Sequence, residues 1–224
     1  GSFAYEAGAK RKVTIDTGTK LGDLTFLSTG LQLEAASLYS DVRISSDWRS
    51  VSNVEVETTL LGISNANVFV GYGIPDWKST TPIRDQEGVF GLAIADIDVA
   101  LAIMKPTGTV GKLFPEFTSL KASAKEFVVA GGGDIFQLFG QDIEVRMNWS
   151  DGWKSAPETK PSIDFVKSFG PEGLAVPTGA EPIYIDFAGG AFIEASIKNA
   201  TLMLSQFVYV QGDFAFRKGG SREV

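Results

Sequence analysis

Apolar and polar residues alternate with a period of two along most of the clearly patterned segments of this 224-residue chain. Side chains of a β-strand point alternately to its two faces, so this alternation predicts half-buried strands. In residues 97–103, Ile97, Val99, Leu101 and Ile103 share one face, and we expect such apolar faces to supply the core. The same pattern occurs in residues 12–16, 31–34, 42–45, 54–57, 143–147 and 208–216.

Helical patterns are few. Residues 34–39 and 119–129 contain helix-compatible residues, although 119–129 also alternates as a strand would. Residues 161–169 begin with Pro161, a residue favoured in the first turn of a helix, and predict one short helix. Residues 170–182 carry three prolines and predict a loop. We therefore expect one continuous all-β domain of elongated antiparallel sheets, as a two-layer sandwich or a flattened barrel-like form, with little helix.

The two ends of the chain resemble each other. Residues 1–13 align with residues 212–224 at a constant offset, and identical pairs include Phe3 with Phe214 and Ala4 with Ala215. Similarity at a fixed period is typical of repeat architecture. We therefore expect residues 1–211 to be one tandem repeat unit and residues 212–224 to be the start of the next. Chance similarity, helped by abundant Gly and Ala, is the alternative.

A second repeat lies inside the chain. Residues 65–68, 96–99 and 142–145 have the form polar, apolar, polar, valine, and each follows a glycine within a few positions. Strands with the same alternation fit together in one sheet with a common face. The alternative is that all amphipathic strands resemble one another.

Composition excludes several classes of chemistry. The chain has no Cys and no His, so it can build neither a thiol nucleophile nor a Ser-His-Asp triad, and it lacks the common zinc ligands. A net charge of −7 repels phosphate backbones and makes nucleic acid an unfavourable partner. No apolar run is long enough to span a membrane as a helix.

Paired acidic residues are the remaining candidates for catalysis or metal binding. Asp96 with Asp98, and Asp142 with Glu144, lie two residues apart on one face of a predicted strand. Such pairs can cleave glycosides or bind calcium, with Asn65 and Asn67 as further oxygen ligands. Solvated strand faces look the same, and no known calcium-loop motif is present. We expect no catalysis and no cofactor, with structural calcium as an open alternative.

Three tryptophans lie in predicted loops or beside them. Trp149 and Trp153 flank one turn, and Trp77 lies in a polar loop. Exposed indoles can stack on sugar rings, which would make the chain a carbohydrate-binding module. Large aromatic side chains more often close the ends of a core, and we favour that interpretation.

Three phrases resemble known sequences when taken together: residues 91–105, 120–124 and 207–216. They are similar to β-rich repeats of very large secreted or surface bacterial proteins, of adhesin or hemagglutinin-like type. The resemblance implies a structural repeat unit of an extracellular or cell-surface stalk, fibre or layer, whose partners are neighbouring copies joined head to tail. It also leaves surface glycans as partners of an adhesin module.

Overall fold

The computed structural model describes residues 1–20, 42–47, 49–133, 135–153, 156–205 and 207–219. Nearly all of the regular structure is β-strand, and the short helices are α2 (Gly108–Gly111), α3 (Phe165–Phe169) and the 3-10 helix η2 (Ile83–Asp85). The strands are β1 (Ser2–Asp16), β2 (Arg43–Ile44), β3 (Ser50–Tyr72), β4 (Phe90–Pro106), β5 (Phe117–Ala130), β6 (Phe136–Ser150), β7 (Ser162–Asp164), β8 (Leu174–Val176), β9 (Ile183–Ile185), β10 (Phe192–Leu204) and β11 (Val208–Gly219).

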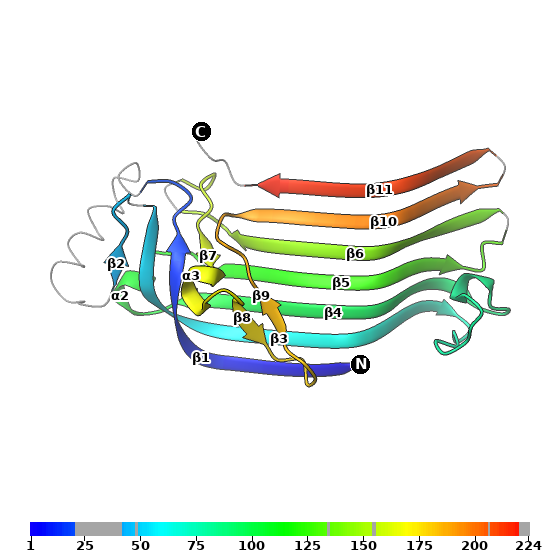
Figure 1. The fold of residues 1–224 in the computed structure, drawn as a ribbon, viewed down its shortest axis with the longest axis horizontal. Helices are drawn as coiled ribbons and strands as arrows, with labels where there is room; N and C mark the ends of the chain where they lie inside the picture. The colour runs from blue at the N-terminus through cyan, green and yellow to red at the C-terminus, as the bar shows by residue number, and fades with distance from the viewer. Residues whose placement is uncertain (21–41, 48, 134, 154–155, 206, 220–224) are drawn as a thin grey trace.

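One antiparallel sheet forms most of the molecule. Its strand order is β11-β10-β6-β5-β4-β3-β1-β7, with β2 paired to β3 and a separate small pair of β8 with β9. The long strands run side by side and curl at one end, as a half-open barrel would (Figure 1). The predicted all-β class with little helix is therefore confirmed. The form is closer to the flattened barrel than to a two-layer sandwich, because the extensive second layer covers the curled end only. At the other end the short helix η2 contacts β5, and Ala93, Val128 and Ala130 are buried there.

That second layer is the cover segment, residues 162–190, which contains β7, α3, β8 and β9. It lies across the curled end of the sheet in Figure 1. We call the sheet face beneath it the inner face and the opposite face the outer face. The core fills the space between the inner face and the cover segment. Its fully buried side chains come from both layers and include Leu60 and Phe117 of the sheet and Phe165, Ile185 and Phe187 of the cover segment.

Two residues of the sheet allow and fix this contact. A Cβ atom on Gly62 would lie 2.0 Å from the Pro177 carbonyl oxygen, so only glycine lets the cover segment approach β3 so closely. Asn148, fully buried, accepts a hydrogen bond from Ser119 and donates from Nδ2 to the Ile163 carbonyl at 2.9 Å. The amide thereby satisfies buried polar groups of both layers.

The core lies on the opposite face of β4 from the one expected. Ala100, Ala102 and Met104 are fully buried against the cover segment. The larger residues expected in the core, Ile97, Val99, Leu101 and Ile103, are only half-buried on the outer face. Small residues occupy the inner face because the cover segment approaches closely there. Alternation identified the two faces correctly but did not reveal which one another layer would cover.

The internal repeat of the sequence marks a line of β-bulges. Its first residues, Asn65, Asp96 and Asp142, all adopt positive φ within their strands, and Asn199 of β10 does so too. Asn and Asp are the non-glycine residues that tolerate this conformation best. The three repeats lie in β3, β4 and β6 of the same sheet, as expected.

Other local expectations have mixed outcomes. Residues 119–129 lie in strand β5 and not in a helix. The helix predicted over 161–169 is present only in its second half, as α3, because residues 162–164 form strand β7. The Asp164 carboxylate caps the first turn of α3 by accepting from the Lys167 N–H at 2.9 Å. The predicted loop 170–182 includes strand β8. The expected strand over 31–34 and the helix candidate 34–39 lie outside the described residues.

Candidate functional site

The outer face of the sheet is apolar from one edge to the other. One row of directly paired residues crosses all seven long strands: Phe3, Ile63, Val99, Ala122, Val145, Ala195 and Phe216. The adjacent row is also apolar except at its last residue: Tyr5, Leu61, Leu101, Leu120, Met147, Ile193 and Lys218. These rows carry the alternating apolar residues that sequence reasoning placed in the core.

The apolar face continues beyond the bulges. On β11, which has no bulge of its own, Val208 and Val210 share the face of Phe214 and Phe216. Farther along the strands, where β3 ends and β4 begins, Tyr72 pairs with Phe90. Both side chains are well exposed, at 81% and 61%. None of these residues has a second layer of described residues over it. Soluble monomers seldom expose so large an apolar surface, so this face is the main candidate for an interaction site.

Both edges of the sheet present unpaired backbone. Among the described residues, β11 pairs only with β10. The edge of β1 that faces away from β3 pairs with β7, and only at Thr14–Asp16. An even number of antiparallel pairings separates β1 from β11, so the two edge strands run in the same direction (Figure 1). Open edges favour pairing with further strands.

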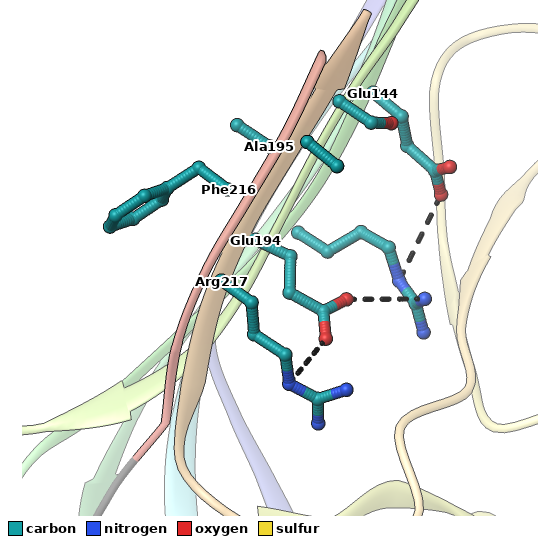
Figure 2. Close-up of a pocket in the computed structure, with 8 residues that line it drawn as sticks. Glu144, Glu194, Ala195, Phe216 and Arg217 are labelled. Atoms are coloured by element: carbon teal, nitrogen blue, oxygen red, sulfur yellow. Dashed lines mark hydrogen bonds and ion pairs between the residues drawn. The ribbon is translucent and has the colours of Figure 1, made fainter. Parts of the chain in front are cut away.

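The inner face carries a row of charges instead. Lys121, Arg146, Glu194 and Arg217 are direct cross-strand partners on β5, β6, β10 and β11. Glu194 accepts from Arg146 at 3.5 Å and forms an ion pair with Arg217 at 3.1 Å, and these groups line an open cleft (Figure 2). Phe216 points to the opposite side of the sheet in the same view.

This cleft connects the sheet to the cover segment. The Arg146 guanidinium lies 5.2 Å from the ring centre of Phe187 and 5.7 Å from that of Phe192, as a cation–π contact requires. Lys121 donates to the Asp186 carboxylate at 2.9 Å and to the Tyr184 carbonyl at 3.0 Å. Each charged side chain here has a structural partner, so the arrangement fits a structural link between the sheet and the cover segment better than a catalytic centre.

The pKa of Asp186 reflects the same contacts. Burial raises this pKa, but the hydrogen bond and charge of Lys121, a backbone hydrogen bond and the charge of Arg146 lower it by more. The pKa therefore lies below the ordinary value of an aspartate. The ionised carboxylate is thus the form that holds the cover segment in place.

The paired acids of the sequence have structural partners. Asp98 Oδ1 accepts from the Asn65 N–H, and Asn67 Oδ1 accepts from the Asp96 N–H, each at 2.9 Å. Asp142 pairs with Lys198 at 3.6 Å, and Glu144 with Arg146 at 3.8 Å. Across the described part of the chain, no three acidic side chains gather as a metal ion would require.

The three tryptophans lie in different environments. Trp153 is 1% exposed, packs on Phe114 with ring centres 5.3 Å apart, and donates from Nε1 to the Thr17 carbonyl at 3.1 Å. It closes the core, so its ring is not available for a sugar. Trp149 and Trp77 are half-buried, and the ammonium groups of Lys160 and Lys218 lie 5.4 and 5.6 Å from the centre of the Trp149 ring. Glycan binding at those two positions stays a prediction.

No protein-family model matches this sequence, and neither the curated proteins nor the solved structures provide a match. Among the described helices, none has the length and apolar character needed to cross a membrane.

Proposed function

We propose that the chain is a non-catalytic structural unit of a large extracellular or cell-surface protein, and that it joins neighbouring copies through its sheet edges. The observation that carries this proposal is the relation between β1 and β11. They have like sequences, Phe3-Ala-Tyr5 and Phe214-Ala-Phe216, and they lie at opposite edges of one sheet.

The geometry of these strands supports the proposal. Both run in the same direction, and both direct their aromatic side chains to the outer face. The next copy along the chain would begin within the β11 segment, so that β11 of one copy would also serve as β1 of the next. The sheet would then continue from copy to copy without an exposed edge between them.

The inner-face cleft supports a structural role as well. Its charged residues contact one another or the cover segment, and no residue in it is a nucleophile beside a base. The bacterial adhesin-like resemblance of residues 91–105 and 207–216 is consistent with the same role.

The test is a protein that carries two units in tandem with the natural spacing, residues 1–211 followed by residues 1–224. We expect it to unfold at a higher temperature than the single chain, because a continuous sheet buries the edges that two separate units expose. The matched control joins two complete chains through a long Gly/Ser linker, which keeps the units close without fixing strand register.

A control that melts as high as the directly joined protein would attribute the gain to proximity and contradict the proposal. Equal melting of the single chain and the directly joined protein would contradict it too. Neither result depends on the outer face, which is intact in all three proteins.

A further inference from the structure

We infer that the outer face is a dimer interface, on which a second copy of this chain packs face to face to complete a two-layer sheet. This inference is independent of the edge-to-edge proposal, because it uses a different surface of the molecule.

The size of the face fits a stable interface. Seven strands about 4.8 Å apart span roughly 30 Å, and the rows from Leu61 to Tyr72 span roughly 35 Å along the strands. Two such faces would bury on the order of 2,000 Å², at the upper end of the range for specific interfaces and at the start of that for obligate ones.

The chemistry of the face favours a copy of the chain over a charged partner. The row from Phe3 to Phe216 contains no charged or polar side chain, whereas Arg146, Glu194 and Arg217 of the same strands point to the inner face. With Lys218 as the one charge in the two rows, at their margin, the face offers little to a lipid headgroup or to a nucleic acid. The chain itself carries a net charge of −7, and this interface keeps those charges away from one another.

The distribution of side-chain sizes fits twofold symmetry. In the rows nearest the covered end, the aromatic residues lie on the edge strands, with Phe3 and Tyr5 on β1 and Phe214 and Phe216 on β11. The central strand β5 carries Ala122 instead. With a twofold axis running along β5, β1 of one copy faces β11 of the other, so aromatic residues meet at both margins and alanines meet in the middle.

The first experiment measures the mass of the whole chain in solution. We expect twice the mass of one chain by light scattering after gel filtration. Val99→Lys or Val145→Lys, each on the outer face, should reduce the mass to that of one chain, because a charge buried at such an interface has no partner. Ser123→Lys, on the exposed inner side of β5, should leave the dimer intact.

The second experiment locates the interface and uses the absence of cysteine from the chain. A single cysteine at Ala122 should be crosslinked between copies by a short bifunctional thiol reagent, since facing sheets lie about 10 Å apart. Its neighbour on the same strand, Ser123→Cys, points away and should remain uncrosslinked.

A chain that stays monomeric at high concentration would overturn the inference, and so would equal crosslinking through Ala122→Cys and Ser123→Cys. Sedimentation of the chain with neutral lipid vesicles, without a dimer in their absence, would assign the face to lipid and overturn it as well. Circular dichroism of each variant must show the unchanged β-sheet spectrum, which separates loss of the dimer from loss of the fold.

Discussion

At the scale of single residues, burial decides the role of groups that look alike in the sequence. Trp149 and Trp153 flank the same turn, but Trp149 is half-buried near the end of strand β6 and Trp153 lies in the core. The residues next to each tryptophan in the sequence do not show which of the two is buried. The difference arises because residues distant in sequence, Thr17 and Phe114, contact Trp153.

The prediction at this scale concerns Trp153. Trp153→Ala should lower the free energy of unfolding by about 3–5 kcal/mol, as expected for a large buried aromatic side chain. Trp153→Phe should cost about 1–3 kcal/mol, because the buried Thr17 carbonyl loses its donor. Urea unfolding measures both. Trp149→Ala is the control with the smaller expected loss, and an equal loss at both positions would contradict the assignment of Trp153 to the core.

At the scale of the elements, the bulges and the cover segment shape the sheet. The N–H group of each bulge residue Asn65, Asp96 and Asn199 donates to a side chain of the neighbouring strand. In β3 and β4 these hydrogen bonds are reciprocal, because the N–H group of each repeat donates to a side chain of the other repeat. Because these N–H groups are held by side chains, the strands keep a fixed register through the irregularity.

The bulge conformation gives a prediction with an internal control. Asp142 has positive φ, so Asp142→Val should destabilise the protein by about 1–2 kcal/mol more than Asp142→Gly. Lys125 lies between Asp96 and Asp142 on the intervening strand β5 and does not have positive φ. At Lys125 the order of stability should be reversed, so that Lys125→Val is more stable than Lys125→Gly. Thermal unfolding of the four variants decides, and the same order at both positions would contradict the bulge assignment.

The cover segment predicts a pH dependence. The pKa of Asp186 is lowered in the folded protein, so its contribution to stability is fully present above the unfolded pKa of about 3.9. That contribution is lost as the pH falls through the lower, folded pKa. Lys121→Met should therefore destabilise the chain at neutral pH, and the difference from wild type should shrink below about pH 4.

Urea unfolding across this pH range measures the effect. Lys125→Met removes an exposed lysine of the same strand, 3.7 Å from Asp96, and should change stability little at any pH. A difference between Lys121→Met and wild type that is constant with pH would show that Asp186 does not titrate as its contacts require.

At the scale of the whole molecule, the curled end of the sheet has a larger second layer than the opposite end, where η2 contacts β5 and Ala93, Val128 and Ala130 are buried. Residues 100–104 of β4 lie under the cover segment, whereas residues 91–94 of the same strand lie at the opposite end. Both stretches are flanked by β3 and β5. Stability should therefore decrease along the strands, because local opening is easier where fewer buried contacts hold the backbone.

Hydrogen exchange tests this gradient. In dilute protein, amides of residues 100–104 should exchange about tenfold more slowly or more than those of residues 91–94, or about 1.4 kcal/mol in opening free energy. Equal protection of the two stretches would contradict the gradient.

The fold class could be read from the sequence, because period-two alternation is a local signal that strands preserve. The repeat of polar, apolar, polar and valine also marked a real feature, the line of bulges. Which face would be covered could not be read, because Val99 and Ala100 both fit a strand. The answer depends on where residues 162–190 fold back, and the small residues Gly62, Ala100 and Ala102 were local signs of that close contact.

The shared direction of β1 and β11 has a consequence for growth. An assembly built by adding copies at these edges has two different ends, one that exposes a β1 strand and one that exposes a β11 strand. Such an assembly is polar, so elongation at one end can be stopped by a cap that leaves the other end free to extend.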